Sequence, residues 1–197
     1  MENTRTLMEA WRPKTRKRVQ RNDESYKQCH ETTAFELERL LDIYKNTVFD
    51  EDMRARLYRD YIDRTIRRYH DYAIKGKIKS HYRQRNVSMA NEDSIFEHTI
   101  PEGVIRDMLI DEVITINQAL NSPTCRVSRT HDRMLSDRGL HDNNPEPWFP
   151  FRRYVNGMSE TVNGQLVMPE FETYNGQLIT DLNTWSFGNH CSFFDIN

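Results

Sequence analysis

The chain has 197 residues, which suits one ordinary domain or a domain with an added arm and tail. Hydrophobic residues make up 37% and charged residues 29%, so we expect a modest core beneath a strongly polar surface. No run of about 18 apolar residues occurs, and no apolar stretch follows the basic N-terminal residues, which argues against a transmembrane helix and a secretory signal. Three scattered cysteines without a CxxC pair suit a reducing compartment. We therefore expect a cytoplasmic protein (in the host cytoplasm if the chain is viral) with no membrane partner.

The net charge of −2 conceals an asymmetry along the chain. Residues 1–89 hold 21 Lys and Arg against 14 Asp and Glu, whereas the remaining residues hold 7 against 16. A cationic half of this kind commonly binds a polyanion, and nucleic acid is the usual one because phosphate contacts release condensed counterions. The alternative is a solvated basic face that binds nothing in particular.

The first half is predicted to be a flexible basic arm at 1–31 followed by basic amphipathic helices at 32–90. Thr32 or Thr33 is the expected cap of the first helix. A second helix, at about 51–75 and ending near Gly76, carries an apolar stripe that we expect in the core. That stripe consists of Leu57, Tyr61, Ile62, Ile66 and Tyr69.

The opposite face of this second helix and the segment after it are strongly basic. Tyrosines interleaved with arginines there are typical either of a core with a solvated face or of a surface that follows a phosphate backbone and stacks on bases. The residues that we expect to bind nucleic acid are Arg59, Arg64, Arg67, Arg68, Lys75, Lys77, Lys79, Arg83 and Arg85.

The second half alternates helical and extended patterns. After a linker at 86–94 and a short apolar step at Ile95-Phe96, helical spacing recurs over 103–120 and a short strand is expected at 125–128. Thr130 is expected to cap a helix at 131–138, which Gly139 closes. The tail, 143–197, carries Asn-Gly pairs between β-forming residues at Asn156-Gly157, Asn163-Gly164 and Asn175-Gly176, which predict β-hairpins.

One order of residues in the middle of the chain is typical of a known enzyme family. Glu97-His98-Thr99-Ile100-Pro101 follows the step at 95–96, and Asn121, a short strand and His131 come later. This order resembles the HNH family of ββα-metal nucleases, over about residues 95–138. The resemblance implies a ββα-metal-like unit at 91–142. Together with the helical spacing before it and the Asn-Gly pairs after it, we expect an α+β fold with a mainly helical N-terminal half and a small β-rich tail. Helix 103–120 would then be an insertion.

The resemblance also implies an activity, the metal-dependent hydrolysis of phosphodiester bonds in nucleic acid, with DNA favoured. His98 would be the base that deprotonates water, and Asn121 (or Asn117) would orient its ring. Glu97 and His131 would hold one divalent cation, Mg²⁺ or Mn²⁺, which stabilises charge on the phosphate.

Two alternatives remain open. The order His98, His131-Asp132, Asp181 also resembles that of HD phosphohydrolases, although the segment 125–130 is more polar than that family has. A non-catalytic nucleic-acid-binding or virus-assembly protein would use the basic arm and the Asn-Gly-rich tail, with His98 in a turn and His131 on a helix surface. An endonuclease needs His98, Asn121 and His131 within metal-binding distance, and a binding protein does not.

Overall fold

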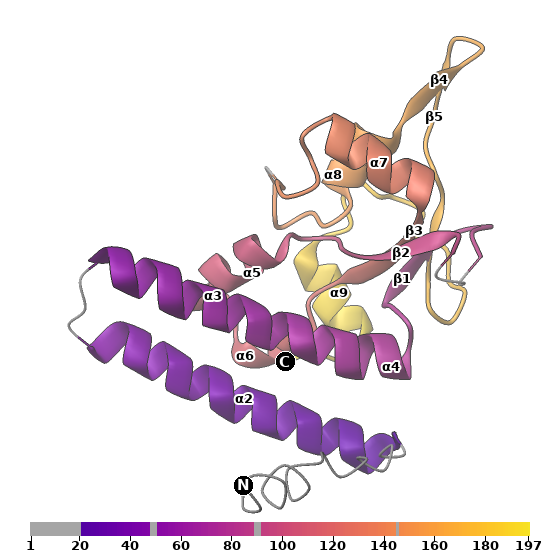
Figure 1. Ribbon diagram of the computed structural model, residues 1–197. Coiled ribbons are helices and arrows are strands. Elements are labelled where there is room, and N and C mark those ends of the chain that lie inside the picture. Colours follow the sequence, from indigo (N-terminus) through magenta and orange to yellow (C-terminus); the bar gives the residue numbers. More distant parts are fainter. Residues whose placement is uncertain (1–20, 48–50, 89–91, 145) are drawn as a thin grey trace, which may run out of the picture.

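The computed structural model describes residues 21–47, 51–88, 92–144 and 146–197. Its N-terminal half is helical, and the remainder combines shorter helices with a four-stranded mixed sheet (Figure 1). The predicted α+β class with a helical N-terminal half is therefore confirmed. None of the described helices is long and apolar enough to cross a membrane.

The first described helix, α2 (Asp23–Asn46), begins earlier than predicted. Asn22 caps it, because its side chain accepts a hydrogen bond from the backbone N–H of Ser25 while the Ser25 hydroxyl accepts one from the backbone N–H of Asn22. The predicted arm at 1–31 is therefore wrong for residues 23–31, and the predicted cap at Thr32 or Thr33 falls inside the helix. The rest of the predicted arm, 1–20, lies outside the described residues.

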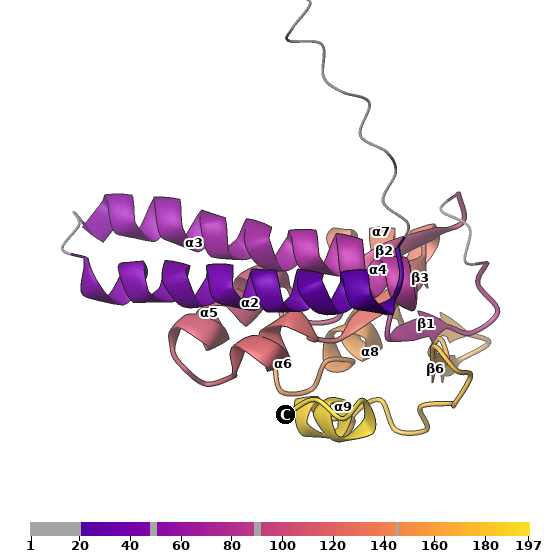
Figure 2. The ribbon, with the colours of Figure 1, turned by 90° about the horizontal axis from the view of Figure 1, so that it is seen from below.

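The second helical segment runs antiparallel to α2, and the two lie side by side in both views (Figures 1 and 2). It consists of α3 (Glu51–Tyr69), a π-helical turn η1 (His70–Ile74) and α4 (Lys75–Lys77), so the predicted end near Gly76 is confirmed.

The predicted apolar stripe of this segment is only partly correct. Ile62 and Ile66 are fully buried and Tyr69 is 6% exposed, as predicted. Leu57 and Tyr61 are 45% and 48% exposed, so their predicted burial is wrong. Because successive helical residues are turned by about 100°, Tyr61 cannot share the face that Ile62 occupies with the residues four and seven positions later.

The central sheet has the strand order β2-β3-β1-β6. Strands β2 (Ser94–His98) and β3 (Thr124–Ser128) are antiparallel, with Ser94 opposite Ser128 and His98 opposite Thr124. The strands expected near 95 and at 125–128 are therefore confirmed as neighbours. Strand β1 (Tyr82–Gln84) pairs parallel to β3 and antiparallel to β6 (Phe171–Thr173).

Two short helices, α5 (Glu102–Ile110) and α6 (Ile116–Leu120), connect β2 to β3. The single helix predicted at 103–120 is therefore wrong. The chain breaks at Glu112, which has a φ of 58°, and restarts at the Thr115 cap of α6. Both helices pack beside the α2–α3 hairpin and contribute to one hydrophobic core with α9 (Phe187–Phe193).

Strand β3 leads directly into α7 (Arg129–Asp137). The cap of α7 is Ser128 and not the predicted Thr130, because the Ser128 side chain accepts from the backbone N–H of His131. Gly139 closes the helix as predicted, with a φ of 68° that suits glycine. Helices α7 and α8 (Arg152–Met158) flank a second core, which contains Tyr82, Phe151 and Phe171 among others.

The C-terminal segment is not a separate β-rich tail. The predicted Asn163-Gly164 hairpin is confirmed between β4 (Glu160–Val162) and β5 (Gln165–Val167), and it projects from the body in Figure 1. The predicted hairpin at Asn156-Gly157 is wrong, because these residues lie in α8, where a Cβ on Gly157 would meet Leu135. The rest of the segment joins the central sheet through β6 and adds α9 to the first core.

Candidate metal-binding pocket

A pocket of about 690 Å³ opens between the π-helical turn, the end of β2 and the start of α5. Carboxylates, imidazoles and cations line it together, which is a combination suited to a metal ion and an anionic ligand. The ionisable lining residues are Asp63, Arg67, Asp71, Lys75, Glu97, His98, Glu102, Arg129, His141 and Asp142.

Glu97 is directed toward α8 from the end of β2. The buried guanidinium of Arg153 donates from Nη2 to Glu97 Oε1 and also to the backbone carbonyl of His98. Burial raises the pKa of Glu97, and the charge of Arg153 opposes that rise. Arg153 also donates from Nη1 to the carbonyls of Leu140 and His141, so it fastens the loop after α7 to the end of β2.

The second oxygen of Glu97 belongs to a cluster with Asp132 of α7 and His141 of the following loop. His141 Nε2 lies 3.8 Å from Asp132 Oδ1 and 4.0 Å from Glu97 Oε2, and one potential ligand atom from each residue lies within 4.8 Å of the others. Asp132 Oδ1 is buried and has no hydrogen-bond partner among the described residues. A buried carboxylate oxygen without a partner is costly, and a cation would satisfy it.

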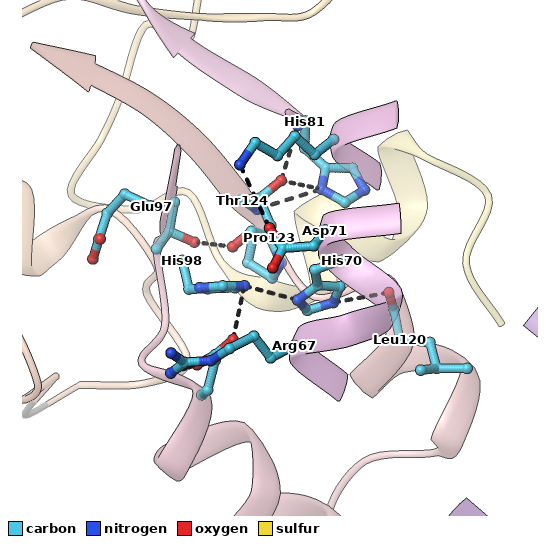
Figure 3. Close-up of polar contacts among 12 residues, drawn as sticks. Arg67, His70, Asp71, His81, Glu97, His98, Leu120, Pro123 and Thr124 are labelled. Atoms are coloured by element: carbon cyan, nitrogen blue, oxygen red, sulfur yellow. Dashed lines mark hydrogen bonds and ion pairs between the residues drawn. The ribbon is translucent and has the colours of Figure 1, made fainter. Parts of the chain in front are cut away.

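His98 belongs to a different cluster on the other side of the strand (Figure 3). Its Nε2 lies 2.9 Å from His70 Nδ1 and 3.3 Å from Glu102 Oε1. Burial lowers the pKa of His70 to about 4 and lowers the pKa of His98 well below its usual value. Burial also raises the pKa of Glu102 to about 7, against the opposing charge of Arg67.

The predicted ligand pair of Glu97 and His131 is not brought together. His131 Nδ1 lies 3.0 Å from Gln84 Oε1 and 2.8 Å from Ser128 Oγ, and it lines a separate pocket with Glu160. Ser128, at the end of β3 just before the helix that carries His131, pairs with Ser94 of β2. Ser94 lies four residues before His98, which is roughly 13 Å along the strand. In α7 it is Asp132, the next residue, that faces Glu97.

The predicted orienting residue and the HD-type set are also not assembled. Asn121 donates from Nδ2 to the side-chain and backbone oxygens of Asn117, and the ring partner of His98 is His70. Asp181 is exposed and accepts from the backbone N–H groups of Asn183 and Thr184. Neither residue therefore contacts His98 among the described hydrogen bonds.

Most of the cations that we expected to bind nucleic acid are paired with carboxylates. Arg68 and Lys79 have no ion pair with any residue that the structure describes, so their charges are uncompensated there. The paired ones are Arg59 with Asp107, Arg64 with Asp60, Arg67 with Glu102, Lys75 with Asp71, Lys77 with Asp23, Arg83 with Glu172 and Arg85 with Glu170. Local pairing weakens the predicted basic surface, and of the whole set only Arg67 and Lys75 line the pocket.

Sequence reasoning missed the residues that complete both clusters. His70 and Glu102 complete one, and Asp132 and His141 complete the other. Their separations along the chain from Glu97 and His98 follow no motif, except that Glu102 comes four residues after His98. Asp132 could have been predicted from the sequence, because it directly follows His131 in the first turn of α7 and supplies the carboxylate that faces Glu97.

No protein-family profile matches the chain, and no curated protein or solved structure matches it either. Function therefore has to be argued from the geometry and chemistry of this pocket.

Proposed function

We propose that the chain is a metal-dependent endonuclease that hydrolyses phosphodiester bonds of nucleic acid at this pocket, with DNA as the favoured substrate. The observation that carries the proposal is the Glu97–Asp132–His141 cluster at the end of the β2–β3–α7 unit. That cluster borders a pocket lined with cations and includes a buried carboxylate oxygen without a partner.

Glu97 and Asp132 fit a hard divalent cation. Mg²⁺ and Mn²⁺ prefer oxygen ligands, and Mg²⁺ is commonly held by one or two carboxylates while it keeps several waters. Arg153 occupies Oε1 of Glu97 and leaves Oε2 toward Asp132 and His141. A bound ion would stabilise negative charge on the phosphate during hydrolysis. Glu97 thus remains a proposed metal ligand, as expected from the sequence, and Asp132 takes the ligand role that was expected for His131.

His141 replaces His98 as the proposed proton acceptor. Its Nδ1 lies 3.0 Å from Asp142 Oδ1, and because a carboxylate accepts, Nδ1 carries the hydrogen of a neutral ring. The lone pair of Nε2 is then directed toward Glu97 and Asp132, where it can take a proton from water. His141 is also the more accessible of the two histidines, since 44% of its side chain is exposed against 17% for His98.

Three cations of the pocket, Arg67, Lys75 and Arg129, are suited to a phosphate backbone. Arg67 and Lys75 reach it from α3 and α4, and Arg129 reaches it from the start of α7. They line the same pocket, whereas Arg83 of β1 and Arg85 just after it lie outside the pocket.

A plasmid-nicking assay with Mg²⁺ or Mn²⁺, against a chelator control, tests this function. We expect His141→Ala to lower the rate about 10²- to 10⁴-fold, as loss of a general base does. Asp132→Asn should raise the Mg²⁺ concentration needed for activity. His131→Ala is the matched control from the same turn of α7 and should keep activity. Absence of cleavage by the wild type with either ion, or loss of activity in His131→Ala but not Asp132→Asn, would reject the assignment.

The non-catalytic alternative is favoured by a specific observation, the separation of His98, Asn121 and His131. A binding protein has no need to bring those three together. It would bind nucleic acid in the same assay conditions with equal affinity in wild type, Asp132→Asn and His141→Ala, and it would nick no plasmid with any ion.

A further inference from the structure

We propose that His70, His98 and Glu102 form a binding site for a zinc-class transition-metal ion, distinct from the Mg²⁺ site of the proposed nuclease. Three separate segments meet there: the first residue of the π-helical turn, the last residue of β2 and the first residue of α5. One nitrogen or oxygen from each lies within 4.8 Å of the others. Two imidazoles and one carboxylate are the ligand set of many catalytic zinc sites.

The surroundings of His70 fix its ring in the orientation that a metal ligand needs. Its Nε2 lies 2.9 Å from the backbone carbonyl of Leu120, and because a carbonyl only accepts, Nε2 carries the hydrogen (Figure 3). The unprotonated Nδ1 of the neutral ring is then directed into the cluster, toward His98. Metal-binding histidines usually donate their other N–H to a carbonyl or carboxylate in this way.

Glu102 supplies an oxygen that lacks a hydrogen bond. Its side chain is 6% exposed, and Arg67 holds Oε2. Oε1 is buried and receives no hydrogen bond from any described part of the chain, although it lies 3.3 Å from His98 Nε2. The neutral ring of His98 has one hydrogen on Nε2, which His70 Nδ1 already accepts. The cluster thus has two acceptors, His70 Nδ1 and Glu102 Oε1, around a single proton.

A dication at this point would satisfy both acceptors at once. Binding requires the hydrogen of His98 to move from Nε2 to Nδ1, so the ring stays neutral and Nε2 becomes a ligand. The rest of the charge is balanced locally, since Asp63 and Asp71 line the same pocket as Arg67 and Lys75. His70 is the first residue of the π-helical turn, and single π-helical turns occur often at functional sites.

The choice of metal follows from the ligands. Imidazole suits Zn²⁺, Fe²⁺, Ni²⁺ and Cu²⁺, whereas Mg²⁺ and Ca²⁺ prefer oxygen-only sites. Three protein ligands beside a pocket leave a coordination position for water or an anion, which is the arrangement of catalytic and not structural zinc.

The test is metal binding by the full-length chain, without nucleic acid. Protein freed of metal with a chelator is titrated with Zn²⁺ in a calorimeter and with Co²⁺ by visible absorption. We expect a tight site that Glu102→Gln and His98→Ala weaken at least about 100-fold, since even the loss of an outer partner costs 10- to 100-fold. His141→Ala, which removes a histidine from the neighbouring cluster, should leave this affinity unchanged.

Folding is checked separately, because His70 and His98 are buried. Glu102→Gln keeps the shape of the side chain, and its circular dichroism should match the wild type. Zn²⁺ should raise the Tm of the wild type and not that of Glu102→Gln. Absence of Zn²⁺ binding by the wild type, or binding that persists in folded Glu102→Gln and His98→Ala, would reject the site. Neither result depends on cleavage, so the nuclease and this site can fail independently.

Discussion

Glu97 and His98 are consecutive in β2, yet the carboxylate of Glu97 reaches Arg153 in α8 and the imidazole of His98 reaches His70 in the π-helical turn. Side chains of a strand alternate between its two faces, so neighbours in sequence are directed to opposite sides. The Glu-His pair that suggests one site in the sequence therefore contributes to two clusters. A single pocket borders both, because the pair lies at the end of the strand.

The buried Glu97–Arg153 pair should be essential for stability. Arg153 is fully buried, and replacing it with Met leaves the Glu97 carboxylate and three backbone carbonyls without their donor. We expect Arg153→Met to lower the free energy of unfolding by about 3–5 kcal/mol at pH 7, measured by urea denaturation. Arg64→Ala, which breaks an exposed pair with Asp60, should cost less than about 0.5 kcal/mol. Equal losses in both variants would contradict the structural role of Arg153.

The two faces of α3 should differ sharply in their tolerance of truncation. Ile66 is fully buried, so Ile66→Ala should cost about 2–5 kcal/mol in the free energy of unfolding because it leaves a cavity. Tyr61 is 48% exposed, and Tyr61→Ala should cost less than about 1 kcal/mol. Thermal denaturation followed by circular dichroism separates the two. A larger loss in Tyr61→Ala would support the stripe expected from the sequence.

The sequence predicted those features that depend on local periodicity. Helical spacing located α3 and its end, and the Asn-Gly signal located the β4–β5 hairpin. Prediction from the sequence failed where tertiary contacts determine the local structure. Asn156-Gly157 lies in a helix and not in a hairpin, because Gly157 permits close packing on Leu135. The cap of α7 was missed by two residues, at Ser128 and not Thr130, because serine and threonine are similarly suitable caps. The cap of the first helix was missed by ten residues or more, because the helix begins directly after Asn22 and not at Thr32 or Thr33.

The site was less predictable than the fold. The β2–β3–α7 order and Glu97 were identifiable from a short motif, but which residue of α7 faces Glu97 depends on where the helix starts. A start at Arg129 brings Asp132 and not His131 to the strand end. His70 is 28 residues from its partner His98, and no local pattern encodes that contact. The many ion pairs of the basic helix likewise depend on distant acids such as Glu102 and Asp107.

Nucleic-acid binding should depend on the cations that line the pocket more than on Arg83 and Arg85, which lie outside it. Changing Lys75 and Arg129 together to Gln should flatten the slope of log K against log salt for duplex DNA by roughly 2, at about 0.9 for each phosphate that is no longer neutralised. The matched double variant Arg83→Gln with Arg85→Gln removes two cations that lie outside the pocket, and it should leave the slope nearly unchanged. Fluorescence anisotropy over a salt series measures both. Undetectable binding of the wild type at low salt would rule out the nucleic-acid partner.

The buried histidine of α9 should make the fold sensitive to acid. His190 Nε2 donates to the backbone carbonyl of Asn121 at 2.7 Å, and Nδ1 lies 2.9 Å from the hydroxyl of Tyr82, which also accepts from Trp185 Nε1. Burial lowers the pKa of His190 from 6.5 to about 4, because the buried site disfavours the charged ring, although the hydrogen bond to Asn121 opposes this shift. Between about pH 6.5 and pH 4, His190 therefore binds a proton in the unfolded chain and not in the folded chain. Its contribution to stability is fully present above pH 6.5 and is lost as the pH falls toward 4.

A pair of variants isolates this contribution from the other titrating groups. His190→Gln should be less stable than the wild type at pH 7, because it disrupts the Tyr82 and Asn121 contacts. The deficit should shrink by about 3 kcal/mol between pH 7 and pH 4. The wild type loses stability in acid because its folded-state pKa of about 4 lies below the 6.5 of the unfolded chain, and the variant has no such histidine. Ile196→Ala, a non-titrating truncation in the neighbouring core, should show a deficit independent of pH. Urea denaturation at half-unit pH intervals gives all three curves. A constant deficit for His190→Gln would mean that His190 is protonated in the folded protein as readily as in the unfolded chain.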